Sequence, residues 1–578
     1  MSIRPMTAKN YRKLISVSQR QQPATVWFKD AHYLNVYTGQ VEKGHITLSG
    51  ERIAYVGDQE PLTNDQTTIV KLNEEQVLVP GYIEPHAHPF QWYNPLTWGE
   101  WLLTKGTTVS INDNMFLIRA LSDREAIQFI EELDSRGQHM WLWWARFDGQ
   151  TATARHEARF SEESVKKWLA HPLVIQGGEL TSWPLLLKGD EELANWMRLA
   201  RQTYGKRIEG HLPGASSETL NILAAAGVGA DHEALNGEDV LKRLRLGLYA
   251  TLRYSSIRPD LPDILREIRE MPGINPALLM LTNDGSMPYF VDQSGCPEML
   301  KMVLEAGFVP EDAYRMVSLN PATYYGLDQE LGGIAPGRLA HINILNGLEN
   351  PQPIHVMVEG EWVVRDGKRL HPLSGEWLTR YFQPLKENIK INTDDLKRGQ
   401  GQIGLQLVNN VITRPYTYDP QQPLADDEAY LSLVANRGEW VLNTRVKGFT
   451  GPALSGLAST FTSSEHYILV GRDYRHMVSA LDQALQLGGG IAAFFEDGNQ
   501  LIIPLPLAGG MSLLSMAELK SISETFVKQM KAYGYPHQDP IYSLLFFTAT
   551  HLPYVRLTSD GVYLIKEQRT ATPVTRLG

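Results

Sequence analysis

The chain has 578 residues, 43% of them hydrophobic and 21% charged, so at about 150 residues per domain it can form two to four domains with full cores. Asp and Glu outnumber Lys and Arg by 65 to 54, and the formal charge of -11 argues against binding to a nucleic-acid backbone. The single cysteine, Cys296, excludes an intrachain disulfide and a cysteine-based zinc cage. We therefore expect a cytoplasmic protein with no nucleic-acid partner.

The first residues carry no signal for secretion or membrane insertion. Residues 1–22 are polar and basic and lack the run of about seven apolar residues that a secretory signal needs. No run of about 18 apolar residues occurs elsewhere in the chain. We interpret residues 1–24 as an N-terminal arm and expect no membrane partner.

Short strand-like runs broken by turn residues occur on both sides of the central part of the chain. Gly39, Gly50 and Gly57 separate the runs in the first part, and the Glu359-Gly360 pair predicts a hairpin in the second. These two all-β parts predict a small β-sandwich domain that is split in sequence. We assign it residues 25–79 and 331–380.

Between the two parts, apolar strand candidates alternate with helical stretches, which is typical of parallel βα units. Capping signals such as Ser122 with Glu125, Asp190 and Gly227 mark the ends of the helices. Eight strands are predicted, the number in a (β/α)8 barrel, so residues 80–330 are predicted to form a barrel. The strands end near His86, Ser110, Arg146, Leu180, His211, His232, Ser255 and Asp284.

The last third of the chain predicts a separate domain. Residues 381–402 are rich in Lys, Asn, Asp and Gly and are interpreted as a linker. Residues 403–578 mix strand and helix patterns, which favours an additional C-terminal α+β domain. The fold class is therefore α/β: a (β/α)8 barrel with a small split β-sandwich domain and this C-terminal domain.

The first barrel strand ends in Glu84-Pro85-His86-Ala87-His88. Alternate side chains of a strand share one face, so His86 and His88 both point to the barrel axis, where two imidazoles can chelate one metal ion. Taken alone, this pattern is equally consistent with two unrelated histidines.

Further ligand-type residues stand at the ends of four later strands: Glu179, His211, His232 and Asp284. The carboxyl ends of barrel strands meet at one mouth, where the catalytic groups of barrel enzymes lie. Six such residues at one mouth favour a metal site over chance. Imidazole and carboxylate ligands without thiolate suit Zn, Fe or Mn.

The chain contains a Gly-His-x-Pro-Gly motif, an Asp-His-Glu motif and the more general His-x-His. These motifs and the pieces that go with them are Pro80-Gly81-Tyr82-Ile83-Glu84-Pro85-His86-Ala87-His88, Gly106-Thr107-Thr108, Gly178-Glu179, Glu209-Gly210-His211-Leu212-Pro213-Gly214, Asp231-His232-Glu233 and Asn320-Pro321-Ala322, with Gly332-Gly333-Ile334-Ala335-Pro336-Gly337-Arg338 and Pro506-Leu507-Ala508-Gly509-Gly510-Met511-Ser512 near the end. On these pieces the sequence resembles the adenine deaminase family of the metal-dependent amidohydrolase superfamily over about residues 24–570. The first two motifs are specific to the deaminase branch.

The resemblance implies a distorted barrel that holds two divalent metal ions, with Mn or Fe favoured and Zn possible. His86 and His88 would hold the first ion and His211 and His232 the second. Glu179 would bridge them, and Asp284 would stand beside them as a further ligand. The family precedent also implies a homo-oligomer.

The implied reaction is the hydrolysis of a cyclic amidine C–N bond: adenine and water give hypoxanthine and ammonia. Two cations lower the pKa of a shared water toward about 7, so that hydroxide is available as the nucleophile at neutral pH. Asp284 is the candidate that accepts its proton and passes it to the leaving amine. Glu233 is the candidate that protonates a ring nitrogen; a solvated carboxylate or a residue at the start of the next helix is the equally weighted alternative.

Several residues depart from the family pattern. Bulky Phe90, Gln91, Trp92 and Tyr93 replace a polar stretch, and Arg253-Tyr254-Ser255-Ser256 and Ser464-Glu465-His466 replace other family motifs. At the eighth strand the family has paired aspartates, whereas this chain has Asn283-Asp284. This leaves open which of the two occupies the position of the catalytic acid.

Two alternatives to adenine deamination remain. The same metal site could act on another aminopurine, a cyclic amide or an N-acyl amide. The chain could also be a catalytically silent homologue that binds a purine, as Asn112 and Asn283 would suggest. Trp141, Trp143 and Trp144 on the third strand are interpreted as core residues.

Overall fold

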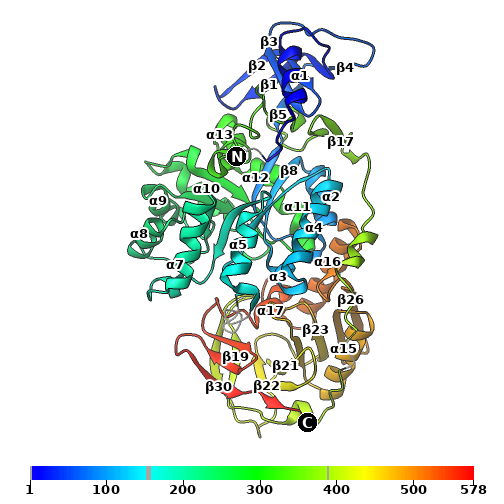
Figure 1. Ribbon diagram of the computed structural model, residues 1–578. Coiled ribbons are helices and arrows are strands. Elements are labelled where there is room, and N and C mark those ends of the chain that lie inside the picture. The colour runs from blue at the N-terminus through cyan, green and yellow to red at the C-terminus, as the bar shows by residue number, and fades with distance from the viewer. Residues whose placement is uncertain (1–2, 151–157, 387–388, 578) are drawn as a thin grey trace.

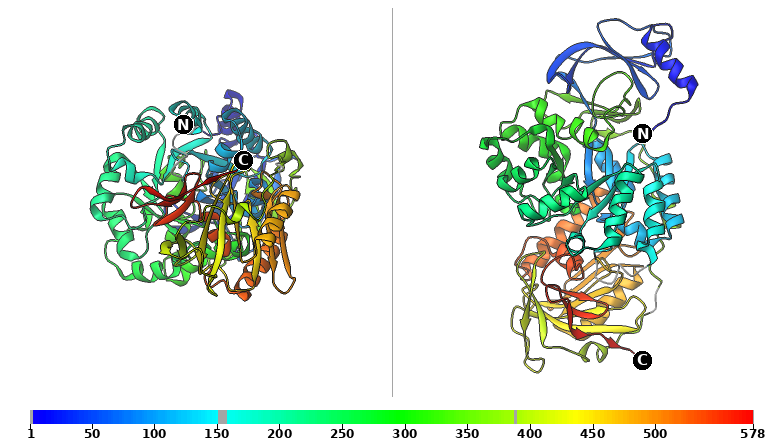
Figure 2. Two further views of the ribbon diagram at one scale, coloured as in Figure 1. Left: turned by 90° about the horizontal axis from the view of Figure 1, so that it is seen from below. Right: turned by 60° about the vertical axis from the view of Figure 1, so that its left-hand side comes forward.

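A computed structural model describes residues 3–150, 158–386 and 389–577. The chain is built of three bodies in a row, with a small β body at one end, a βα barrel in the middle and a C-terminal body at the other end (Figure 1). The same order is visible in the right-hand view of Figure 2. Helix α1 (Ala8–Ser18) packs against the small β body. Within the described residues, no helix is both long and apolar enough to cross a membrane.

The small β body combines the two separate parts of the sequence in one sheet. The link is the antiparallel pair β5–β15, in which Ile342 lies opposite Pro80. The predicted hairpin turn occurs at Glu359 and Gly360, both with positive φ. The sheet contains β1 (Val26–Asn35), β2 (Gln40–Ser49), β3 (Arg52–Gly57), β4 (Thr68–Lys71), β5 (Gln76–Pro80), β15 (Ile342–Asn346), β16 (His355–Val358), β17 (Glu361–Arg365) and β18 (Lys368–Arg369).

The central sheet has eight parallel strands, as predicted. A parallel bridge between Ala87 and Asp284 brings its last strand back beside its first, so the sheet nearly closes as a barrel. All carboxyl ends therefore open at one mouth. The strands are β6 (Tyr82–Ala87), β8 (Thr107–Asn112), β9 (Met140–Ala145), β10 (Val174–Leu180), β11 (Arg207–Gly210), β12 (Ala230–Asp231), β13 (Tyr249–Arg253) and β14 (Leu279–Thr282).

Helices surround this barrel (Figure 1). The predicted capping box of Ser122 and Glu125 is present, Asp190 caps its helix through Leu193 N, and Gly227 ends another helix at φ +112°. The helices are α2 (Pro95–Thr104), α3 (Met115–Ala120), α4 (Asp123–Arg136), α5 (Glu162–Ala170), α6 (Trp183–Leu186), α7 (Glu191–Arg198), α8 (Ser217–Ala226), α9 (Gly237–Arg245), α10 (Leu261–Glu270), α11 (Val291–Ser294), α12 (Cys296–Glu305), α13 (Pro310–Arg315) and α14 (Leu319–Tyr325).

The C-terminal body has a large mixed sheet covered by helix α15 (Tyr474–Gln486), which contacts β23 and β25. A three-stranded sheet and helices α16 (Met516–Ala532) and α17 (Pro540–Phe546) complete it. The strands are β19 (Ile403–Leu407), β20 (Thr413–Thr417), β21 (Glu428–Val434), β22 (Trp440–Lys447), β23 (Leu454–Ser459), β24 (Tyr467–Gly471), β25 (Gly490–Phe495), β26 (Gln500–Pro504) and β31 (Thr575–Arg576), with β28 (Val555–Thr558), β29 (Gly561–Leu564) and β30 (Arg569–Pro573).

The segment predicted as a linker is partly packed. Ile389, Ile391 and Leu396 are buried in the same apolar cluster as Leu469 and Leu481 of the C-terminal body. These apolar side chains are spaced too irregularly to signal a helix or a strand. Their contacts hold this part of the segment against the C-terminal body.

The bulky segment after His88 joins the barrel to the C-terminal body. Strand β7 (Trp92–Tyr93) pairs in parallel with β27 (Met511–Ser512), and both of its residues are fully buried. The Trp92 ring packs edge-on against Phe461 and Phe526. This packing accounts for the apolar residues that replace the polar family pattern here.

Helix α17 begins at a buried aspartate that predicts a pH-dependent stability. Asp539 accepts from the Ile541 and Tyr542 amides and from the Tyr289 hydroxyl, yet burial raises its pKa to about 6. The folded state therefore binds this proton more tightly than the unfolded chain. Ionisation of Asp539 therefore lowers the free energy of unfolding. This loss is absent below about pH 4, grows as the pH rises, and is complete above about pH 6.

We expect the wild type to lose up to about 3 kcal/mol of stability relative to Asp539→Asn as the pH rises through this window. Asparagine keeps the oxygen that caps the helix but carries no charge. Denaturant unfolding of both proteins at several pH values measures the difference. A constant difference between pH 4 and 7 would contradict the assignment.

Candidate active site

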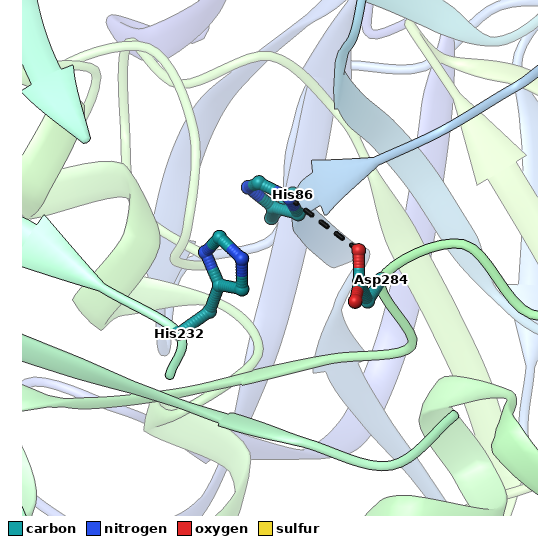
Figure 3. A group of neighbouring side chains, drawn as sticks. All are labelled: His86, His232 and Asp284. Carbon is teal, nitrogen blue, oxygen red and sulfur yellow. Dashed lines mark ion pairs between the residues drawn. The ribbon is translucent and has the colours of Figure 1, made fainter. Parts of the chain in front are cut away.

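The end of β6 places two histidines against the aspartate that follows β14. The Nε2 atoms of His86 and His88 lie 3.2 Å apart. Asp284 Oδ1 lies 3.5 Å from His86 Nε2 (Figure 3) and 3.1 Å from His88 Nε2. Two ring nitrogens and a carboxylate oxygen therefore face one another, as ligands of a common cation do.

A second set of donors lies beside the first. His211 Nδ1 is 3.2 Å from His232 Nε2, and Glu179 Oε1 is 2.6 Å from the former and 3.5 Å from the latter. The ring centroids of His86 and His232 are only 4.0 Å apart, so the two sets are contiguous (Figure 3).

Three groups of donor atoms at this mouth have the spacing of a metal site. In each group the donor atoms lie within 4.8 Å of one another. His86, Glu179 and His232 each belong to two of the groups. The groups are His86, His232 and Asp284; His86, His88 and Glu179; and Glu179, His211 and His232.

Carboxylates hold the far nitrogens of three of these histidines. Glu209 spans two rings, with Oε2 3.0 Å from His86 Nδ1 and Oε1 3.3 Å from His232 Nδ1. Asp113 Oδ2 lies 3.0 Å from His88 Nδ1. A histidine that donates one N–H to a carboxylate turns the lone pair of its other nitrogen outward, which is the arrangement around protein-bound metals. The donor set therefore fits divalent cations.

The excess of negative charge in the site also favours bound cations. Five carboxylates surround the histidines, against three guanidinium groups. Burial and His86 oppose a proton on His232, yet its bonds to Glu179 and Glu209 raise its pKa to about 9. Positive charge at the ring nitrogens is thus strongly favoured. The acidic residues are Asp113, Glu179, Glu209, Glu233 and Asp284, and the basic ones are Arg146, Arg253 and Arg258.

Arg253, at the end of β13, connects the two predicted catalytic acids. Its Nη1 donates to Glu233 Oε1 at 2.8 Å and to Asp284 Oδ2 at 2.9 Å, and Arg258 adds a further ion pair to Glu233 at 3.2 Å. Burial raises the pKa of each acid, but for Glu233 the charges of Arg253 and His211 outweigh burial. In the same way, the pKa of Asp284 is lowered by its contacts with His86, His88 and Arg253, which outweigh the effect of burial. Both pKa values lie well below the ordinary range.

Arg146, at the end of β9, connects the two sides of the mouth. It binds Asp113 through two hydrogen bonds of 2.8 Å, and its Nη2 lies 2.7 Å from Glu179 Oε2. Trp144 donates from Nε1 to Asp113 at 3.1 Å and stacks on the His86 ring. Trp144 is therefore a core residue, as predicted, that also supports the site.

A cavity of about 1150 Å³ opens above these groups. The barrel contributes His88, Glu179, Glu233 and Asp284 to its lining, with the apolar side chains of Phe90 and Trp183. The C-terminal body covers the other side with Ser464, Tyr542 and Phe546, among others. Both bodies are therefore needed to enclose a bound molecule.

All seven residues singled out from the sequence lie at this mouth. Asp284 lines the cavity. Asn283 is buried, and its backbone amide donates to Glu84. Of the two, only Asp284 faces the histidines.

Five charged residues of the site were not predicted: Asp113, Arg146, Glu209, Arg253 and Arg258. Asp113, Arg146 and Arg253 stand at the ends of β8, β9 and β13, so the rule that found Glu179 would also have found them. Glu209 lies on β11 two positions before His211, and alternation along the strand was the available signal.

Two family models match the chain: the amidohydrolase family over residues 77–363 and the adenine deaminase C-terminal domain over residues 408–569. The chain is 42% identical to a protein of Halalkalibacterium halodurans and 36% identical to one of Bacillus subtilis. Each match covers 98% of this chain and 98% of the relative. Both relatives carry the name "Putative adenine deaminase". An "Adenine deaminase" of Cenarchaeum symbiosum is 27% identical over 99% of this chain and 96% of that protein.

Among solved structures, the beta-aspartyl dipeptidase of Fervidobacterium islandicum matches 61% of this chain and 99% of its own, with a TM-score of 0.48 and 17% identity. The family assignment rests on the sequence matches, which extend over the barrel and the C-terminal body alike. The chain belongs to the adenine deaminase family of the metal-dependent amidohydrolases.

Proposed function

We propose that this protein is a metal-dependent aminohydrolase that converts adenine and water to hypoxanthine and ammonia. One observation carries the proposal: four histidines, Glu179 and Asp284 converge at the barrel mouth of a chain that matches adenine deaminases from end to end. The enclosed cavity supports a small-molecule substrate.

The donor set supports two divalent ions, with His86 and His88 at one and His211 and His232 at the other. Glu179 is proposed to bridge them, and Asp284 to complete the first set. Imidazole and carboxylate donors suit Mn, Fe or Zn, and we favour Mn or Fe. Such ions lower the pKa of water and so supply a nucleophile at neutral pH.

Asp284 is the proposed proton acceptor. Its low pKa keeps it ionised, and its Oδ1 faces the histidine cluster while Arg253 holds Oδ2. It would take a proton from the attacking water and deliver it to the leaving amine. The C6–N bond of adenine breaks and a C6–O bond forms, so water supplies the oxygen of hypoxanthine.

Glu233 is the proposed second proton carrier. Arg253 and Arg258 hold it ionised, so in the resting site it accepts hydrogen bonds. It can protonate a ring nitrogen only after it has itself taken up a proton. An ionised Glu233 can instead bind an N–H group of the substrate.

Glu209 tests the proposed metal set without removing a proposed ligand. Glu209→Gln replaces the acceptor of two ring N–H groups, at His86 and His232, by an amide with one acceptor oxygen. We expect the affinity for metal to fall about 10-fold to 100-fold. Competition with a chromophoric chelator measures it, and excess metal should restore part of the activity. An unchanged affinity would contradict the proposed role of these histidines.

Metal analysis and an ammonia-release assay test the proposed function directly. Protein purified without chelator should contain up to two divalent ions per chain and release ammonia from adenine. If the protein instead releases ammonia from another aminopurine, or hydrolyses a cyclic or N-acyl amide, that compound rather than adenine is its substrate. If the protein contains stoichiometric metal but converts none of these compounds, the remaining interpretation is a catalytically silent homologue that binds a purine.

Several expectations from the sequence stay predictions. They are the domain limits, a location in the cytoplasm, self-association of the chain and the lack of a nucleic-acid or membrane partner. The excess of acidic residues and the single, buried Cys296 support the prediction of a cytoplasmic protein without a nucleic-acid partner.

A further inference from the structure

Two buried polar side chains at the cavity have unused hydrogen-bonding groups. Gln91 is 9% exposed and Tyr542 is fully buried. Among the residues that the structure describes, neither Gln91 Oε1 nor the Tyr542 hydroxyl has a hydrogen-bond partner. Leaving such groups unpaired is costly, so they point to a partner that arrives with the substrate.

The two side chains come from different bodies and converge on one point. Gln91 lies between β6 and β7, and Tyr542 lies on α17. A Cβ on Gly285 would lie 2.9 Å from Gln91 Nε2 and 3.1 Å from the Tyr542 hydroxyl. Both polar groups therefore lie beside Gly285, the residue that follows Asp284 in the chain.

Both residues line the same cavity as His88 and Asp284. Neither belongs to the donor groups described above, and neither carries a charge at neutral pH. Their available chemistry is therefore hydrogen bonding. An amide offers a donor and an acceptor side by side, and a phenol hydroxyl can do either.

We propose that Gln91 and Tyr542 bind the polar edge of the substrate heterocycle and so determine which heterocycles enter the site. This inference rests on the proposed aminohydrolase function. An amide group matches the adjacent N–H donor and ring-nitrogen acceptor of an aminopurine. Since Tyr542 lies on α17, the C-terminal body takes part in substrate selection as well as enclosing the cavity.

Gln91→Leu and Tyr542→Phe remove these polar groups and nearly keep the shape of the side chains. We expect each to raise KM for adenine at least about tenfold and to change kcat by less than about threefold. Calorimetric titration with hypoxanthine should show the same loss of affinity. Because an unpaired buried group is removed, the melting temperature without ligand should stay the same or rise.

Gln529→Leu and Tyr416→Phe are matched controls. Each also removes a buried side-chain polar atom, but neither residue lines the cavity. Both controls should keep the wild-type KM. Gln91→Met replaces Gln91→Leu if the latter fails to fold.

Deaza analogues of adenine identify the contacts. For the analogue that lacks the ring nitrogen bound by Gln91, the wild type and Gln91→Leu should differ less than they do with adenine. A wild type that deaminates adenine, with unchanged KM in both variants, would overturn this inference and leave the proposed function intact. A raised KM with a lowered melting temperature would show a structural role and overturn it too. No ammonia release by the wild type from any aminopurine would overturn both.

Discussion

Asp284→Asn is expected to lower kcat/KM for adenine by about 10³-fold or more while the two proposed metal ions remain bound at saturating metal. General base catalysis by a positioned carboxylate accounts for about 10² to 10⁴ in rate, and an amide cannot accept the proton. Four histidines and Glu179 remain as donors in the variant. Steady-state kinetics together with metal analysis of the same sample measure both quantities.

A neutral change at a remote aspartate provides the control. Asp395 is buried in the C-terminal body and does not line the cavity, so Asp395→Asn should keep the wild-type kcat. Near-wild-type turnover by metal-loaded Asp284→Asn would exclude Asp284 as the proton acceptor. Loss of the metal itself would show that Asp284 acts mainly as a ligand.

Glu179→Gln is expected to weaken the binding of both ions at once and to lower kcat by about 10³-fold or more. Glu179 belongs to two of the three donor groups, so one substitution affects both sets of histidines. The amide has no negative charge to pair with Arg146, and only one of its two polar atoms is an oxygen. Metal content after dialysis against buffer, followed by titration with Mn, measures the loss.

Glu428→Gln is the matched control, because Glu428 is also buried opposite a buried arginine, Arg445. It should retain the wild-type metal content even if its stability falls. Selective loss of one ion in Glu179→Gln, with the other held at wild-type affinity, would contradict a bridging role.

Much of the barrel and of the predicted ligand set followed from local pattern. Alternation along β6 put His86 and His88 on one face, and eight βα units indicated a closed parallel sheet. Once the strands are parallel, their carboxyl ends must share a mouth, so strand-end residues such as Glu179 and Asp284 can be brought together without knowledge of any contact.

Contacts between distant segments could not be obtained in this way. Glu209 spans His86 and His232, and Arg253 joins Glu233 to Asp284. These pairings depend on the stagger and closure of the sheet, and on which rotamers fit among the neighbours. No periodicity in the sequence records them.

The chemical groups of the site and the edge of the sheet at which they gather follow from the sequence alone, because strand periodicity and the alternation of strands with helices are legible in short stretches of chain. That Asp284 rather than Asn283 faces the histidines, and that Tyr542 of the C-terminal body reaches the cavity, became evident only from the folded chain. These placements depend on how the chain turns after β14 and on how Trp92 and its neighbours pack the two bodies together.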